Sequence, residues 1–341
     1  MSSHHPAAPD RRPVVLVTSR SFGTGGANLV ACLEQGGYQV VRAGSDHDLA
    51  GLAPALGRAV GWVAGTGPVT AHHLAAAPAL RAIARYGVGV DAVDLAAAES
   101  AGVTVTNTPG ANTEAVAEHA LALLLAVLRR VPDGDARLRA GDWTVRRGRQ
   151  LGGSTVGVVG FGRIGRASAR LLAGLGCTVL VHDPYVLEEQ VTAAGYTPVP
   201  LARLRTRAGA VSLHCPGGEV LVDERWVAEA PAGQVIVNTA RASLVDEAAV
   251  AAGLRSGRLH GYAADTLATE TAGAGADGVS PLLDPALRDR VVLTPHLGAQ
   301  TEEAIDRMGR AAVEDLLAVL AGREPAHPVV QPRPRPSEVP A

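Results

Sequence analysis

The chain has 341 residues, of which 47% are hydrophobic and 19% charged, and its formal net charge at pH 7 is −2. This composition is typical of a folded protein, and the length is sufficient for two domains with separate cores. The near-neutral charge lacks the dense basic face that holds nucleic acid, so we expect no nucleic-acid partner. Any attraction for an acidic substrate must come from a few local arginines.

The sequence also disfavours secretion, membrane insertion and a metal site. Residues 1–12 contain no apolar segment of the kind found in secretory signals. The most apolar stretch, Ala115 to Leu128, contains Glu118 and His119 and is too short to cross a bilayer, so it predicts a buried helix. The three cysteines are scattered without metal-ligand spacing, which favours buried, reduced thiols in a cytoplasmic protein.

Short β-branched runs alternate along the chain with alanine- and leucine-rich segments, a pattern typical of α/β proteins with parallel strands. The first series of expected strands is Val14–Thr18, Gln39–Arg42, Gly61–Ala64, Leu80–Ala84 and Val103–Asn107. The second is Thr155–Gly160, Thr178–Asp183, Ala210–His214, Gln234–Asn238, His260–Ala264 and Val291–Thr294. Apolar spacing predicts helices at 29–36, 162–175 and 246–256.

A long helix is expected between the two series. After the Pro-Gly pair of "TNTPGANTEAVAEHALALLLAVLRR", Asn112 or Thr113 can cap about five turns of apolar helix. A last helix, Glu302–Ala321, follows the second series and can return to the first lobe. The tail "EPAHPVVQPRPRPSEVPA" is proline-rich, so we expect it to be extended or disordered, with no core to join.

The stretch "VGVVGFGRIG" carries the strongest local signal. It places Gly160, Gly162 and Gly165 between a buried strand and a helix, where they allow a tight turn, a close approach to a pyrophosphate and close helix–strand packing. Asp183 ends the next strand, where its carboxylate can accept both ribose hydroxyls and repel a 2′-phosphate. The motif therefore predicts NAD rather than NADP. Arg163 either touches the pyrophosphate or is a solvated residue of the first helical turn.

Hydride transfer to a nicotinamide also requires a cation for the substrate anion, an acid/base group and a partner that tunes it. Candidates follow strands of the second series: Arg241, Asp265 with Glu270 five residues on, and His296. Ligands of open α/β sheets bind at the carboxyl ends of the strands, so these positions are expected at one edge of the sheet.

These residues carry a family resemblance over roughly residues 60–322. The chain resembles the D-2-hydroxyacid dehydrogenases of the phosphoglycerate dehydrogenase and formate dehydrogenase group. The resemblance rests on "RYGVGVDAVDL", "VTNTPGANTEAVAEHALALLLAVLRR", "VGVVGFGRIG", "VNTARASLVDEAAV", "GYAAD" and "TPHLGAQTEEA". It implies two Rossmann-like doubly wound domains, with the cofactor domain (108–299) inserted in a substrate domain (12–107 and 300–325) and followed by the proline-rich tail (326–341).

The resemblance also implies roles for individual residues. Arg241 binds the substrate anion, while Glu270 favours the imidazolium form of His296 and raises its pKa, so that the two act as an acid/base pair. A homodimer built on the long helix near Asn112 is implied as well. The cofactor contacts implied are Thr108, Arg163, Ile164, Asp183, Cys215, Thr239 and Asp265.

Several departures from the family pattern leave the substrate open. The family's "LDVF..EP" reads "ADTLATET" here, without a proline after Glu270, and the segment from there to His296 is long. That length is similar to the phosphite dehydrogenase branch, but the lysine which that branch uses is missing from "YGVGVD". Arg85, Arg146 and Arg147 are candidates for binding a phosphate, or are solvated surface residues.

Three functions follow from these observations. The leading hypothesis is an NAD-dependent dehydrogenase of a small D-2-hydroxy acid, such as 3-phosphoglycerate or the hydroxypyruvate/glyoxylate class. The second is a dehydrogenase of a hydroxyalkyl phosphonate or related phosphorus oxoanion, motivated by the long segment. The third is an NAD-sensing, corepressor-like binding protein. Turnover with a panel of hydroxy and keto acids separates the first two from the third.

Overall fold

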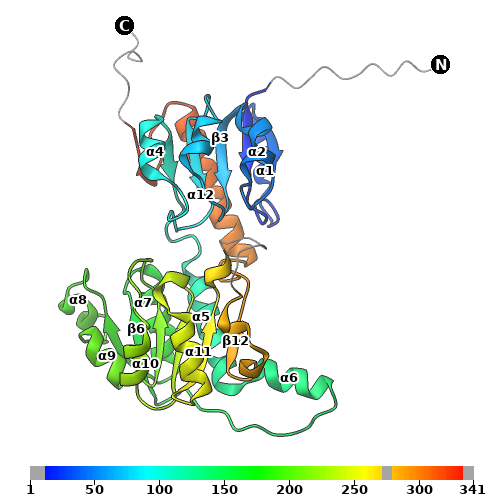
Figure 1. Cartoon of the computed structure of the whole chain (residues 1–341). Helices are drawn as coiled ribbons and strands as arrows, with labels where there is room; N and C mark the ends of the chain where they lie inside the picture. Colours follow the sequence, from blue (N-terminus) through cyan, green and yellow to red (C-terminus); the bar gives the residue numbers. More distant parts are fainter. Residues whose placement is uncertain (1–11, 271–278, 333–341) are drawn as a thin grey trace. The chain divides into compact units, whose positions relative to one another are not determined.

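The computed structural model describes residues 12–270 and 279–332, except for the side chain of Glu270. The chain forms two compact units (Figure 1). Unit 1 combines the residues up to Asn112 with those from Gln300 onward, and unit 2 is Thr113–Ala299. Each unit is built around its own sheet, parallel throughout in unit 2 and parallel except for β13 in unit 1, in agreement with the fold-class prediction. Within the described ranges, no helix combines the length and apolar composition needed to cross a membrane.

Unit 1 contains a six-stranded sheet in the order β13-β5-β4-β3-β1-β2. The first five strands along the chain pair in parallel, and all five coincide with runs expected from the sequence. They are short and mostly apolar because helices cover both faces of the sheet. Their bounds are β1 Val14–Val17, β2 Gln39–Arg42, β3 Ala59–Ala64, β4 Ala82–Arg85 and β5 Thr104–Thr106.

The helices of unit 1 form a layer on each face of its sheet. The terminal helix α12, drawn in orange in Figure 1, packs on β3, β4 and β5 and contacts α1. Gly61 of β3 leaves room for α12, because a Cβ there would lie 3.1 Å from Leu316. The other layer buries its leucines with Trp62 of β3. The helices are α1 Leu29–Gln35, α2 Leu49–Leu56, α3 Ala71–Ala75, α4 Leu95–Ser100 and α12 Glu302–Leu320.

The start of the proline-rich tail has a core to join, so the prediction was wrong there. Strand β13, Pro328–Val330, pairs antiparallel with β5 at the edge of the unit 1 sheet, and Val329 and Val330 pack against the unit 1 core. The buried carboxylate of Asp315 holds the approach, accepting hydrogen bonds from the backbone N–H groups of Ala326 (2.7 Å) and His327 (3.2 Å). Proline is tolerated because an edge strand uses only one side of its backbone.

Unit 2 contains a seven-stranded parallel sheet in the order β12-β11-β10-β9-β6-β7-β8. Six of these strands were expected, and β8 is a two-residue addition at one edge. The strand order reverses at β6, which has β7 on one side and β9 on the other. The bounds are β6 Thr155–Val159, β7 Thr178–His182, β8 Thr197–Pro198, β9 Ala210–Leu213, β10 Gln234–Asn238, β11 Leu259–Ala264 and β12 Val291–Leu293.

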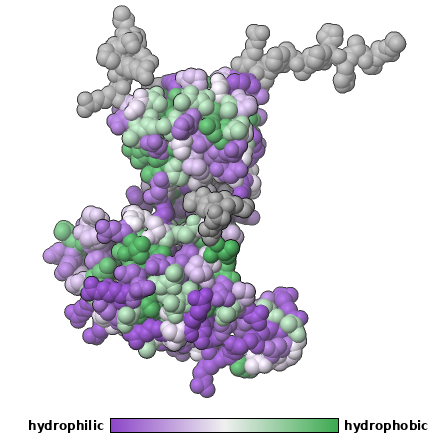
Figure 2. Space-filling model, in the orientation of Figure 1, coloured by the Kyte–Doolittle hydropathy of each residue, from purple (hydrophilic) through white to green (hydrophobic). Residues whose placement is uncertain are grey.

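Two helical layers cover the unit 2 sheet (Figure 1). One core cluster buries the inner faces of α5 and α7 against it, and the other buries those of α9, α10 and α11. Hydrophilic residues make up most of the visible face of this unit (Figure 2). The helices are α5 Thr113–Arg129, α6 Val131–Arg139, α7 Arg163–Gly174, α8 Glu188–Ala193, α9 Leu201–Arg207, α10 Glu224–Glu229 and α11 Glu247–Arg255.

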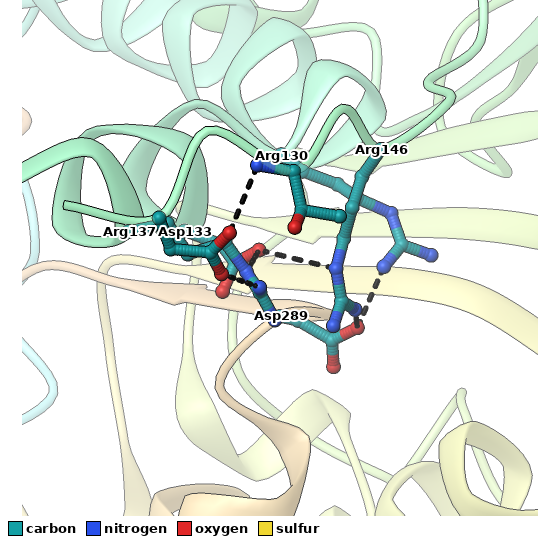
Figure 3. A network of polar contacts seen from close by, with 7 residues as sticks. Arg130, Asp133, Arg137, Arg146 and Asp289 are labelled. Carbon is teal, nitrogen blue, oxygen red and sulfur yellow. Dashed lines mark hydrogen bonds and ion pairs between the residues drawn. The ribbon is translucent and has the colours of Figure 1, made fainter. Parts of the chain in front are cut away.

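An ion-pair network fastens α6 and the segment after it to the sheet (Figure 3). Asp289, just before β12, accepts from Arg130 (2.6 Å) and from Arg146 (2.8 Å). On α6 itself, Asp133 accepts from Arg137 at 2.9 Å and lies 3.8 Å from Arg146. Arg146, a candidate for phosphate binding, thus has two carboxylate partners within unit 2, whereas Arg85 belongs to unit 1.

Candidate functional site

The sequence-predicted site residues of unit 2 follow the carboxyl ends of its strands. Gly160 comes after β6, Asp183 after β7 and Cys215 after β9. Thr239 and Arg241 follow β10, Asp265 follows β11 and His296 follows β12. Because all these strands are parallel, their ends share one edge of the sheet, at which the strand order reverses beside β6. Ligands of open α/β sheets bind at such an edge.

The glycine loop requires glycine at two positions for steric reasons. Gly160 has φ +92°, and a Cβ there would lie 2.7 Å from the backbone of His214 and Cys215. A Cβ on Gly165 would lie 1.9 Å from the carbonyl oxygen of Gly160, so the first turn of α7 packs directly against the backbone of the loop. Gly162 differs, because a Cβ there would meet no atom within 4 Å among the described residues. Its exposed backbone is open to a ligand.

Gly160→Ala should therefore damage the loop. The substitution puts a Cβ at a left-handed position and against the backbone after β9, so we expect a loss of about 2 kcal/mol or more in the free energy of unfolding. NADH affinity, measured by fluorescence titration, should fall with it. Gly162→Ala is the matched control, for which we expect a smaller change in the stability of the ligand-free protein. Equal stability of the wild type and Gly160→Ala would contradict this account.

Asp183 is tied to the glycine loop. Its Oδ2 accepts a hydrogen bond from the N–H of Phe161 at 2.6 Å, and its Oδ1 accepts one from the N–H of Tyr185 at 2.8 Å. These bonds fix the carboxylate next to the loop. Arg163 and Ile164 begin α7, whose N-cap Gly162 provides no side-chain cap. The amides of this first turn can therefore face an anion.

Two further polar groups stand at the same edge. Burial raises the pKa of the Cys215 thiol, and the charge of Asp183 raises it further, so the thiol lies within electrostatic reach of that carboxylate. The Oγ1 of Thr239 is buried and has no hydrogen-bond partner within the described residues. A buried hydroxyl without a partner is costly, which marks it as a group that can bond to a ligand.

Arg241 is held by the turn that follows β10. Its Nη1 donates to the carbonyl of Ala240 at 2.8 Å, and its own carbonyl accepts from the Nδ2 of Asn238, also at 2.8 Å. Asn238 is fully buried, and its Oδ1 accepts from the N–H of Ala240 at 3.0 Å. The sequence analysis did not single out Asn238. Its position at the end of a buried strand is the signal that could have found it.

The carboxylate of Asp265, just after β11, accepts hydrogen bonds from several donors. Its Oδ1 accepts from the Thr294 hydroxyl (2.5 Å) and the Leu297 N–H (2.7 Å), and its Oδ2 accepts from the Gly298 N–H (2.7 Å). His119 Nε2 lies 3.2 Å from Oδ1. Burial alone raises the pKa of Asp265, but these four donors outweigh burial and hold it below the usual range. The carboxylate is therefore ionised at neutral pH.

His296 stands in the turn that Asp265 organises. Its N–H donates to the carbonyls of Asp265 (3.1 Å) and Thr294 (3.0 Å), and its φ is +56°. Left-handed backbone is uncommon for a residue with a side chain and occurs where the surroundings enforce it, often at functional sites. The imidazole is thus carried by a constrained turn directly after β12.

The remaining predicted residues are placed differently. Glu270 ends the short 3₁₀ segment Ala268–Glu270, and its side chain lies outside the described part of the chain, as do residues 271–278 of the long segment that follows. Thr108 belongs to unit 1, where it is buried and its Oγ1 has no partner among the described residues. Sequence reasoning missed Thr294 and His119, the latter noted only as a polar interruption of an apolar helix.

A family model identifies this arrangement. Residues 121–298, about half of the chain, match the model described as "D-isomer specific 2-hydroxyacid dehydrogenase, NAD binding domain". The chain belongs to this family. The match lies within unit 2, so the glycine loop and the strand ends after it are part of the NAD-binding domain, and the prediction of NAD is confirmed.

Individual relatives in the family bear different names. D-3-phosphoglycerate dehydrogenase of Mycobacterium tuberculosis is 44% identical over 259 residues, which are 74% of this chain and 48% of that protein. The chain therefore matches about half the length of such relatives. Glyoxylate reductase of Korarchaeum cryptofilum is 36% identical over 276 residues, covering 78% of this chain and 81% of the relative. The crystal structure of the TT0316 protein from Thermus thermophilus superposes with a TM-score of 0.81 at 38% identity, covering 93% of this chain and all of that one.

The residues of the NAD-binding domain fit the cofactor that its family implies. Gly162 leaves open space over the start of α7, Asp183 is fixed beside the loop, and Thr239 holds an unpartnered buried hydroxyl. These features suit a pyrophosphate, a ribose diol and a hydrogen-bonding ligand group, respectively.

Proposed function

We propose that the protein is an NAD-dependent dehydrogenase of a small D-2-hydroxy acid, interconverting it with the 2-keto acid. The proposal rests mainly on the positions of Arg241 and His296. Arg241 follows β10 and His296 follows β12, with only β11 between them, at the same edge of the sheet as the glycine loop. The names of the phosphoglycerate dehydrogenase and glyoxylate reductase relatives support two substrate classes, 3-phosphoglycerate-like acids and the hydroxypyruvate/glyoxylate class.

The chemistry divides among the residues as follows. NAD supplies the acceptor for the hydride that leaves C2 of the hydroxy acid. Arg241 binds the substrate carboxylate, for which its planar fork of donors is suited. His296 removes the hydroxyl proton during oxidation and returns it during reduction, with Glu270 as its partner. Gly160, Gly162, Arg163, Ile164, Gly165, Asp183, Cys215, Thr239 and Asp265, with Thr108 of unit 1, are the proposed cofactor residues.

The test is a panel of substrates followed by NADH absorbance. The purified chain is mixed with NADH and glyoxylate, hydroxypyruvate, pyruvate or 3-phosphohydroxypyruvate, and in reverse with NAD and the matching D- and L-acids. We expect turnover with at least one keto acid and with its D-acid only. Tight NADH binding without turnover of any member would overturn the proposal in favour of a binding protein.

Asp183 should set the choice of cofactor. Its charge repels a 2′-phosphate, so we expect kcat/KM with NAD to exceed that with NADP by about a hundredfold, equal to roughly 3 kcal/mol. Asp183→Ala combined with Tyr185→Arg should shift the preference toward NADP. Asp183→Asn is the matched control, since it retains an acceptor for the Phe161 N–H but loses the charge. Wild-type protein that uses both cofactors equally would contradict the assignment.

We further propose that the homodimer expected on the long helix α5 also uses α6 and the segment after it, which directly follow α5. Supporting this, Trp143 and Val145 are 81% and 93% exposed, an unusual state for large apolar side chains. Trp143→Asp with Val145→Asp should yield monomer in sedimentation velocity. Leu187→Asp, at an exposed apolar position by α8, is the control and should leave the dimer intact. A monomeric wild type would refute the proposal.

A further inference from the structure

We propose that His119 is a positioning residue for the reaction: through Asp265 and Thr294 it fixes the turn that carries His296. This inference rests on the proposed function, because it assigns His119 a part in the same site. It starts from a histidine on the sheet-facing side of α5, seven residues into the helix and with a side chain only 19% exposed.

The contacts determine which atom of His119 carries a proton. Its Nε2 lies 2.9 Å from the Thr294 Oγ1 and 3.2 Å from the Asp265 Oδ1. The Thr294 hydroxyl has one hydrogen, which it gives to the ionised Asp265 at 2.5 Å. Thr294 Oγ1 is thus an acceptor toward His119, and so is the carboxylate. The Nε2 of His119 must therefore be the protonated nitrogen, shared between the two oxygens.

These bonds extend to the turn that holds His296. Asp265 accepts from the N–H groups of Leu297 and Gly298 through its side chain, and from the N–H of His296 through its carbonyl. Residues on both sides of His296 are thereby tied to one buried carboxylate. Three of the four donors, from Thr294, Leu297 and His119, converge on Oδ1, and the fourth, from Gly298, reaches Oδ2. Asp265 therefore holds the turn through Oδ1 and Oδ2, and Oδ2, with one donor, keeps acceptor capacity for the cofactor contact proposed above.

The packing of Gly298 shows that α5 and the turn fit closely. A Cβ on this residue would lie 3.0 Å from the Asp265 Oδ2, 3.5 Å from Val116 and 3.8 Å from the His119 ring. The turn is therefore seated against the face of α5 that presents His119. Loss of the His119 hydrogen bond leaves the carboxylate one donor short and allows it, and the turn that it holds, to shift. Displacement of a reacting group by about 1 Å can cost about a hundredfold in rate.

The first arm of the test is kinetic. His119→Leu should lower kcat by about tenfold or more, while the KM for the keto acid and the affinity for NADH change by no more than about twofold. His119→Gln, whose amide can donate in place of Nε2, should recover most of the loss. Thr294→Val should resemble His119→Leu, and Thr294→Ser should resemble the wild type. Glu118→Leu, the same replacement at the exposed neighbouring position, is the control and should retain wild-type kcat.

The second arm does not depend on turnover. Amide hydrogen exchange of the ligand-free protein should show faster exchange at Leu297 and Gly298 in His119→Leu, with the strands of unit 2 unchanged. Wild-type kcat and exchange in His119→Leu, a loss confined to KM or NADH affinity, or a Gln variant as impaired as the Leu variant would each overturn the inference. If the wild type turns over no acid, the proposed function fails and the exchange arm alone decides. If the Leu variant does not fold, Thr294→Val and His119→Gln decide.

Discussion

Arg241→Lys should lower kcat/KM for the keto acid by about 10²–10³-fold, equal to roughly 3–4 kcal/mol of transition-state stabilisation. The charge is kept, but an ammonium has no planar fork with which to hold a carboxylate by two parallel bonds. A lysine also cannot both satisfy the Ala240 carbonyl, which accepts from Arg241 Nη1, and reach a substrate with the same geometry.

The measurement is a full kinetic analysis with NADH held at saturation, together with a fluorescence titration of NADH alone. NADH affinity should remain within about twofold of the wild type, because the residues proposed to hold the cofactor are not altered. Arg170→Lys, at an exposed arginine paired with Glu114, is the matched control and should behave as the wild type. Unchanged turnover in Arg241→Lys would mean that the substrate anion is bound elsewhere.

The sheets were predictable because burial of parallel strands on both faces leaves a strong local pattern. All the β-branched runs expected as strands form strands, and the largest departure at any end is two residues, at β3 and β4. The glycine loop was equally predictable from the sequence, because the strand, the glycines and the helix are contiguous along the chain. The misses are β8 and β13, where the local sequence is short or proline-rich and pairing depends on an edge that another segment provides.

The polar side of the site was harder to predict. The residues after each strand could be named, since a parallel sheet brings those ends together. The hydrogen bonds could not, because His119 and Asp265 are far apart in sequence and meet only when α5 packs on β11. The same reason explains Arg146, whose partner Asp289 comes from another element. Long-range pairing of polar groups leaves no periodic trace in a single sequence.

His296→Asn should have the largest effect of any single substitution at the site. Asparagine tolerates the left-handed backbone at φ +56°, so the turn can persist while the acid/base group is lost. General acid–base catalysis contributes about 10²–10⁴-fold, and we expect kcat to fall by an amount in that range. NADH affinity should hardly change. Turnover near the wild-type level would exclude His296 as the proton donor.

The pH dependence of reduction separates the role of His296 from that of Glu270. In the proposed mechanism the imidazolium form of His296 donates the proton during reduction, so the rate should fall as pH rises through the midpoint for its deprotonation. A neighbouring carboxylate favours the charged form, so Glu270→Gln should move that fall to lower pH, by about one unit for a pair in a partly solvated site. The exposed Glu188→Gln is the control and should leave the midpoint unchanged.

The sign of the shift decides between two roles for Glu270. If Glu270 only ends the 3₁₀ segment, its charge does not reach the imidazole of His296. The wild type and Glu270→Gln should then have coincident midpoints. A shift to higher pH would contradict both roles, since removal of a negative charge cannot favour an imidazolium. In His296→Asn the fall with pH should disappear, because the titrating group is gone. The measurement is the pH profile of kcat, under saturating NADH and keto acid, for the wild type, Glu270→Gln and His296→Asn. Coincident midpoints for the first two would remove Glu270 from the acid/base pair while leaving His296 in place.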